Sequence, residues 1–134
     1  MVIVALQKSI CATIKYDKKG KRKWVERFNG NANGSDRAYA IALDAHKNVY
    51  VTGYSDSGRT LTRYDFATIK YSDKGKRRWI TRYDGAKHAE DRGQSVAVYK
   101  SKIVYVLGRS PGLLPSQDYA LQRLNGDSDN QDWV

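Results

Sequence analysis

The side chains that could carry out chemistry in this chain are few, and they lie far apart in the sequence. The chain has one cysteine, Cys11, and two histidines, His46 and His88. A nucleophilic cysteine needs a base beside it, and a metal site needs several ligands at short spacing. Neither a second cysteine nor a neighbouring histidine is present. We therefore predict no enzyme, no catalytic residues, no metal site and no cofactor.

A second group of polar residues recurs at a spacing of 55 residues, as Asp36-Arg37 and again as Asp91-Arg92. These pairs, with Asp65 and Asp118, lie in or beside segments rich in Gly, Asn and acidic residues. Irregular loops on a rigid scaffold often carry binding sites. We expect this loop surface to bind a protein or glycan through Asp36, Arg37, Asp91, Arg92, Asp65 and Asp118. A repeated Asp-Arg pair can also simply hold a loop in place, and this alternative stays open.

The chain is strongly basic, with 24 Lys and Arg against 14 Asp and Glu, which gives a formal charge of +10. Such a charge attracts nucleic acid or other polyanions through their phosphates. No helix-turn-helix, zinc-finger or aromatic RNA-binding motif accompanies it. A polyanion or nucleic-acid binder is the alternative function, and a solvated basic rim is the plainer interpretation. Its residues are Lys18, Lys19, Lys21, Arg22, Lys74, Lys76, Arg77 and Arg78.

The elements that position these residues are repeated. The run "ATIKYDKKGKRKW" from Ala12 returns as "ATIKYSDKGKRRW" from Ala67, and about 20 of the 42 positions from 12–53 and 67–108 are identical. A third copy begins near residue 120 and ends in Trp133. We expect one domain over 1–134, with repeats at 12–66 and 67–119, a partial repeat at 120–134 and a partial strand at 1–11.

Each copy contains four short strand signals, which in the first copy are "ATIKY", "KWVERF", "AYAIALD" and "NVYVTGY". Gly20 and Gly75 can supply the positive φ of the first hairpin turn. Val49 and Val51 alternate with Tyr50 and Tyr54, so both faces of the sheet are apolar and need covering. In the third strand, Ala38, Ala40 and Ala42 predict a small face opposite Tyr39, Ile41 and Leu43.

These features predict an all-β fold of β-propeller blades, each with four antiparallel strands, with a β-sandwich or solenoid as alternatives. We expect the four strands of one copy to form one blade. Roughly two full blades and partial blades at both termini are predicted. Trp24 and Trp79 recur once per copy, which favours packing between blades over a sugar or peptide pocket.

The residues that carry a family resemblance are "DFATIKY" (65–71), Gly75, Trp79, "RYDG" (82–85), "RFNG" (27–30), "DRAYAIALD" (36–44) and "NVYVTG" (48–53). Together they resemble SBBP, a bacterial β-propeller repeat family. The resemblance implies a propeller scaffold, commonly in exported or surface proteins, without shared catalytic residues. The chain departs from the family at the turn before the fourth strand, where Gly-Asn is usual and Lys47-Asn48 and Lys102-Ile103 stand here.

The chain holds fewer repeats than the four to eight blades of a propeller. A partial propeller exposes apolar faces and open strand edges, which promote association. We therefore predict a homo-oligomer, with a dimer of six blades as the simplest ring; the alternative is a fragment of a longer protein. The sequence has no apolar run of the length that crosses a membrane, and we expect "MVIVAL" to form a strand.

Overall fold

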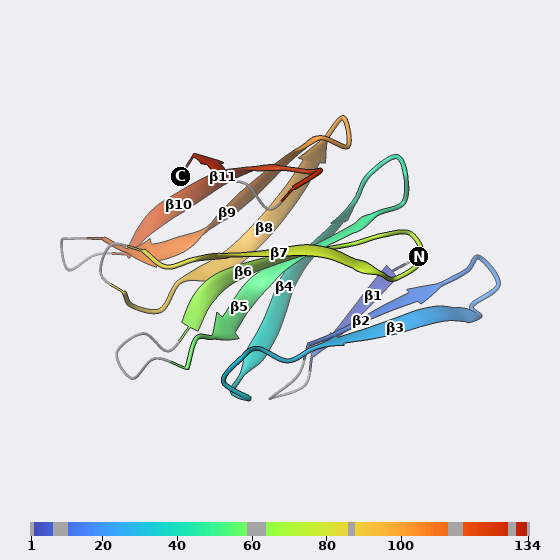
Figure 1. Cartoon of the computed structure of the whole chain (residues 1–134), viewed down its shortest axis with the longest axis horizontal. Helices are drawn as coiled ribbons and strands as arrows, with labels where there is room; N and C mark the ends of the chain where they lie inside the picture. Colours follow the sequence, from blue (N-terminus) through green and yellow to red (C-terminus); the bar gives the residue numbers. More distant parts are fainter. Residues whose placement is uncertain are drawn as a thin grey trace.

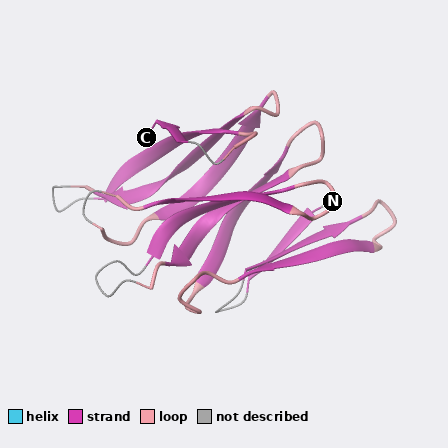
Figure 2. Ribbon diagram, in the orientation of Figure 1, coloured by secondary structure: helices cyan, strands magenta, loops and turns pink. Residues whose placement is uncertain are grey.

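The computed structural model describes residues 2–6, 11–58, 64–85, 88–112, 117–128 and 131–133. Within these ranges the fold contains strands and turns and no helix, as Figure 2 shows. The prediction of an all-β protein is therefore confirmed. In this part of the chain no helix has the length and apolar character needed to span a membrane.

The strands form three antiparallel sheets (Figure 1). The first sheet has the order β1-β2-β3, the second β4-β5-β6-β7 and the third β11-β10-β9-β8. The bounds of the strands are β1 Val2–Leu6, β2 Cys11–Tyr16, β3 Arg22–Phe28, β4 Asp36–Leu43, β5 Val49–Asp56, β6 Tyr64–Tyr71, β7 Arg77–Tyr83, β8 Arg92–Tyr99, β9 Ile103–Pro111, β10 Gln117–Asn125 and β11 Gln131–Trp133.

The sequence repeats and the sheets are out of phase by two strands, which corrects the expectation that one copy forms one blade. The second sheet takes β4 and β5 from the first copy and β6 and β7 from the second. Every strand is joined to the next by a short connection, so the local pattern cannot identify the connection at which the chain changes sheet. In the structure these connections are the loops before β4 and β8.

The same phase shift determines which sheets the N-terminal and C-terminal segments join. The third repeat completes a four-stranded third sheet by supplying β10 and β11, so this piece is not a partial blade. The strand β1 pairs with β2 and gives a first sheet of three strands. Two four-stranded sheets are thus present, and the incomplete sheet is at the N-terminal end.

The sheets pack face to face through two separate cores. Between the first and second sheets, Cys11 and Phe28 meet Val49, Val51 and Tyr71, among others. Between the second and third sheets, the core contains Tyr50, Phe66, Trp79, Val104, Val106 and Leu124. Neighbouring residues of β5 enter opposite cores, which confirms that the second sheet is buried on both faces.

A β-bulge in β4 changes the predicted separation of small and large side chains. The register shifts between Ala38 and Ala40, so that Tyr39 is the extra residue. Ala38 and Ile41 consequently pack against the same core, although simple alternation assigned them to opposite faces. Tyr39 stays exposed on the other side of the bulge.

Connections alternate between the two ends of the sheets, as predicted for up-and-down blades. The hairpin turns after β2, β4, β6 and β8 lie toward one end, and the C-terminal ends of β3, β5 and β7 lie toward the other (Figure 1). We call these ends the turn rim and the loop rim. The sheets come closest along their edge strands β4 and β8, which places these strands at the inner edge.

Candidate functional site

Two of the six residues predicted to bind a ligand at the loop rim are buried anchors of their own loops. Asp36 Oδ2 accepts a hydrogen bond from the Gly30 backbone N–H at 2.7 Å, and Asp91 Oδ2 accepts one from Gly85 at 2.8 Å. Asp36 is 2% exposed and Asp91 is 0% exposed. The two carboxylates therefore close equivalent loops, which favours the loop-holding alternative for them.

The anchor in the third sheet is packed tightly enough to require a glycine. A Cβ atom on Gly85 would lie 2.1 Å from Ser110 Oγ and 2.9 Å from Asp91 Oδ1. Burial raises the pKa of Asp91 above its usual value, although hydrogen bonds from Ser110 and Gly85 act in the opposite direction.

The other predicted loop-rim residues have different surroundings. Asp65 is buried, whereas Arg37 and Asp118 are exposed. Arg92 is partly buried and forms an ion pair with Glu90 at 2.6 Å. Some of the carboxylates and guanidinium groups at this rim are thus buried inside the protein, and others are exposed to solvent. A ligand role for them stays a prediction.

A tyrosine cluster beside Arg92 was not predicted from the sequence. The Arg92 guanidinium lies 5.3 Å from the ring centroid of Tyr54 and 5.9 Å from that of Tyr64. The rings of Tyr54 and Tyr64 are 4.5 Å apart, and Tyr39 lies 5.8 Å from Tyr54. The residues come from four strands, β4, β5, β6 and β8, of two sheets, so only the bulge and the sheet packing bring them together.

The turn rim gathers the basic residues as predicted. Each of the eight, from Lys18 to Arg78, is exposed. Their turns are shaped by short polar side chains: Asp17 Oδ1 accepts the backbone N–H groups of Lys19 and Lys21, and Ser72 Oγ accepts that of Lys76. Gly20 and Gly75 have φ values of 77° and 88°, which confirms their predicted role.

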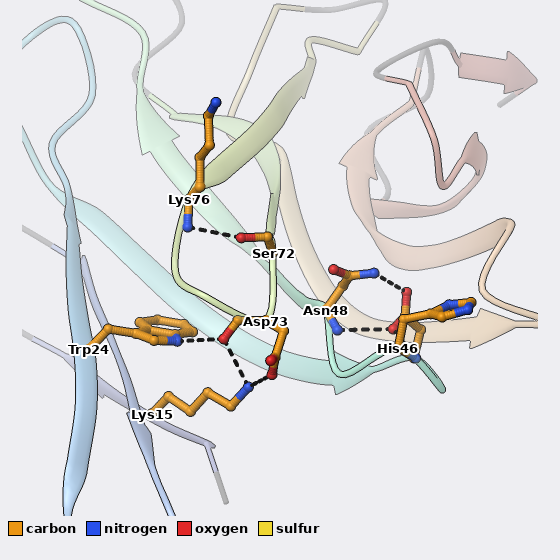
Figure 3. Close-up of polar contacts among 8 residues, drawn as sticks. Lys15, Trp24, His46, Asn48, Ser72, Asp73 and Lys76 are labelled. Carbon is orange, nitrogen blue, oxygen red and sulfur yellow. Dashed lines mark hydrogen bonds and ion pairs between the residues drawn. The ribbon is translucent and has the colours of Figure 1, made fainter.

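The turn after β4 is built in a similar way around Asp44, on the same rim (Figure 3). Its carboxylate accepts hydrogen bonds from Asn48 and from the His46 backbone N–H. Burial raises the pKa of Asp44, but the hydrogen bonds from Asn48, Tyr50 and His46 outweigh it, and the pKa lies below its usual value.

Each sheet is tied to the next by a lysine and a tryptophan that share one acceptor. In the first sheet, Lys15 Nζ and Trp24 Nε1 donate to the backbone carbonyl of Asp73 at 3.0 and 2.9 Å (Figure 3). Lys15 also forms an ion pair with the Asp73 side chain, which lowers the pKa of that carboxyl group. Lys15 and Trp24 are directly opposed across β2 and β3.

The second sheet repeats this arrangement, which we call the inter-sheet clamp. Lys70 Nζ and Trp79 Nε1 donate to the backbone carbonyl of Gly126 at 2.5 and 3.2 Å. Asp73 and Gly126 occupy equivalent positions in their repeats. The recurring tryptophans therefore pack between sheets and donate hydrogen bonds to the next sheet. Packing between blades was the interpretation that the sequence favoured.

A groove opens on the turn rim between the first two sheets, next to the first clamp. Its volume is about 560 Å³, which is within the range of about 300–1,000 Å³ found for small-molecule sites. The residues that line it are Lys15, Tyr16, Asp17, Lys18, Lys23, Trp24, Lys47, Asp73 and Lys74. Of these, Lys18 and Lys74 were predicted as part of the alternative basic site.

The cysteine and the histidines are placed apart. Cys11 is buried in the first core, and burial raises the pKa of its thiol to about 11, which disfavours the nucleophilic thiolate. His46 is on the turn rim, while His88 is in the loop before β8 and pairs with Asp84 at 2.7 Å. In the described ranges no three His, Cys, Asp or Glu residues are grouped as a metal site would require.

Successive antiparallel sheets that stack face to face, with an inner edge strand and hairpins alternating between two rims, define a repeat of the β-propeller class. Residues 23–58 match the family model of SBBP, the beta-propeller repeat. The resemblance noted in the sequence is thereby confirmed for this segment, which runs from β3 through the end of β5. No curated protein matches the chain.

Proposed function

We propose that this protein is a noncatalytic β-propeller repeat module that acts as an interaction scaffold and completes its propeller by associating head to tail with a second copy. The family match supports the noncatalytic repeat class. Three sheets from each of two chains would give six, within the range of about four to eight blades found in propellers.

The observation that carries the proposal is the outer face of the third sheet. In the second sheet, Thr52, Phe66 and Thr68 face the third sheet and are at most 1% exposed. The equivalent residues of the third sheet are Leu107, Tyr119 and Leu121, which are 42%, 85% and 42% exposed. Leucines thus replace threonines on a face that has no cover within the described chain.

The opposite end of the stack presents the complementary face. In the second sheet, Ile69 and Ile80 face the first sheet, and Ile69 is 4% exposed. Their equivalents in the first sheet are Ile14 and Val25, a directly opposed pair on β2 and β3 that is only partly buried. The two open faces differ, so the contact that repeats the internal packing is heterologous, third sheet against first sheet.

The clamp supports the same pairing of faces. Lys70 and Trp79 reach the turn of the next sheet, and Arg123 and Trp133 are their register equivalents in the third sheet. The position equivalent to Asp73 and Gly126 in the first sheet is Lys18, in the exposed β2–β3 turn. In the proposed arrangement, the first sheet of a second copy packs on the third sheet. The Lys18 carbonyl of that copy then takes the acceptor position that Asp73 and Gly126 have within one chain.

The test measures mass in solution as a function of concentration, by light scattering after size exclusion. We expect the 15.2 kDa chain to form a two-chain species that Tyr119→Glu or Ile14→Glu reduces to one chain. Leu43→Glu is the control, since Leu43 is also exposed but belongs to the inner edge of the second sheet. A parent chain that stays monomeric at all concentrations contradicts the proposal.

Mixing the two variants tests the head-to-tail geometry itself. Tyr119→Glu leaves the first-sheet face intact, and Ile14→Glu leaves the third-sheet face intact, so the mixture retains one compatible pair of faces. A two-chain species in the mixture, absent from either variant alone, is the expected result. If Ile14→Glu alone still dimerises, the contact joins two like faces and the head-to-tail arrangement is wrong.

The ligand of this scaffold is proposed to bind at the loop rim, as a protein or glycan. The tyrosine cluster with Arg92 supports that surface, because aromatic rings and guanidinium groups are enriched in recognition sites. Arg37 and Asp118 are exposed on the same rim. Glycan-array binding that weakens on Tyr39→Ala and Arg37→Ala, with folding unchanged, is the result we expect.

A further inference from the structure

The groove between the first two sheets carries an excess of positive charge. Five lysines line it, against the two carboxylates of Asp17 and Asp73. Lys15 is already paired with Asp73. The remaining lysines are Lys18, Lys23, Lys47 and Lys74, all of which are exposed.

These four ammonium groups are little used by the protein. Lys23 lies 4.0 Å from Asp17, at the limit of an ion pair, and Asp17 also accepts two backbone N–H groups of its own turn. In the described part of the chain, Lys18, Lys47 and Lys74 form no side-chain hydrogen bond or ion pair. The charges of Lys47 and Lys74 help to lower the pKa of Asp73, but neither ammonium group is held in an ion pair, so both are available with Lys18 to an anion in the groove.

The position of Lys47 adds a backbone observation that does not depend on counting charges. Its φ is 64°, in the left-handed region where glycine or asparagine is favoured and another residue costs roughly 1 kcal/mol or more. The chain nevertheless has lysine at this turn position, and the side chain lines the groove. Lys100 has a similar φ of 47° but does not line the groove, so what distinguishes Lys47 is that its left-handed turn position places a lysine side chain in the lining.

The composition of the groove selects among anions. Its cationic groups are lysine ammoniums, and arginine is not part of the lining. Lysine interacts with phosphate as a point charge, whereas planar bidentate recognition of a carboxylate uses arginine. Gly75 lies against one face of the Trp24 ring, where a Cβ atom would be 2.9 Å from the ring, so that face is not open for stacking on a base.

We propose that this groove binds a chain of phosphate groups, through Lys18, Lys47 and Lys74 with Lys23 at its edge. Phosphates supplied by a free polyphosphate and by a nucleic-acid backbone share this chemistry. The site uses the Lys18 side chain, whereas the proposed contact between copies uses the Lys18 backbone carbonyl, so phosphate binding does not require self-association.

The experiment is a calorimetric titration of the full chain with inorganic tripolyphosphate and, separately, with a single-stranded oligonucleotide. The groove variant is Lys18→Gln/Lys74→Gln. The control variant is Lys21→Gln/Lys76→Gln, which removes the same charge from the same two turns. Lys21 and Lys76 are exposed but do not line the groove, and Lys76 points away from Lys15 and Trp24 in Figure 3.

We expect the groove variant to lose affinity by about tenfold or more and the control variant by less than about threefold, with affinity falling between about 50 and 200 mM salt. Tighter binding of tripolyphosphate assigns the site to free phosphate chains, and tighter binding of the oligonucleotide assigns it to a nucleic-acid backbone. Equal losses in the two variants, or no binding by the parent chain, overturn the proposal.

Discussion

At the scale of single residues, the recurring aspartates are the clearest case of a motif with two possible interpretations, a ligand site and a loop anchor. The sequence identified Asp36 and Asp91 as special through their spacing, and the structure buries both against the backbone N–H of a glycine six residues earlier. Sequence spacing could not decide between a ligand site and an anchor. That decision depends on burial, which follows from the loop folding over the end of the sheet.

Replacing Asp91 by alanine should destabilise the fold. The Gly85 N–H loses its acceptor in a buried loop, and an unsatisfied buried donor costs about 1–3 kcal/mol. Urea unfolding of Asp91→Ala measures the change. Asp118→Ala is the matched control and should change the free energy of unfolding by less than about 0.5 kcal/mol, because Asp118 is exposed. Similar effects of the two substitutions would contradict the anchor role.

At the scale of elements, the strand boundaries follow closely from the sequence, whereas pairing into sheets does not. The predicted run "ATIKY" is β2 within one residue, and "KWVERF" is β3. The bulge at Tyr39 was missed because alternation of side chains assumes an uninterrupted ladder. The inter-sheet clamp was also outside the reach of local patterns, since Lys70 and Trp79 meet Gly126 from positions about 50 residues away.

The clamp should show strong coupling between its two donors. Lys70→Met and Trp79→Phe each remove one hydrogen bond to the Gly126 carbonyl and keep most of the buried apolar surface, at a cost of about 0.5–1.5 kcal/mol each. The double variant leaves this buried carbonyl without either donor, so its loss should exceed the sum by about 1 kcal/mol. Chemical denaturation of the four chains tests this, and simple additivity would exclude a shared acceptor.

At the scale of the whole molecule, the two ends of the stack are unlike faces with large apolar side chains exposed at one of them. The same face is covered in the second sheet and uncovered in the third. Phe66 of the second sheet is 1% exposed, whereas its equivalent Tyr119 in the third sheet is 85% exposed. In the second and third sheets, β4 and β8 form the inner edge and complete a sheet of four strands. In the first sheet, no described residue forms a corresponding strand next to β1. The exposed apolar face favours assembly over an isolated stack of three sheets.

Association of folded chains makes thermal stability depend on protein concentration. We expect the midpoint of thermal unfolding to rise by roughly 2–5 °C for each tenfold increase in concentration of the parent chain. The Tyr119→Glu variant should lose this dependence. Differential scanning calorimetry over a hundredfold concentration range measures both, and a parent midpoint that does not move would argue against assembly.

The sequence by itself determined the all-β class, the strands, the hairpin turns at Gly20 and Gly75, and the relationship to a β-propeller repeat. These properties depend on local periodicity, turn chemistry and internal repetition, all of which can be read along the chain. Only the tertiary structure decided which strands share a sheet, that Asp36 and Asp91 are buried, and that lysines from three separate turns line one groove. Those properties depend on contacts between residues distant in sequence, which local patterns do not encode.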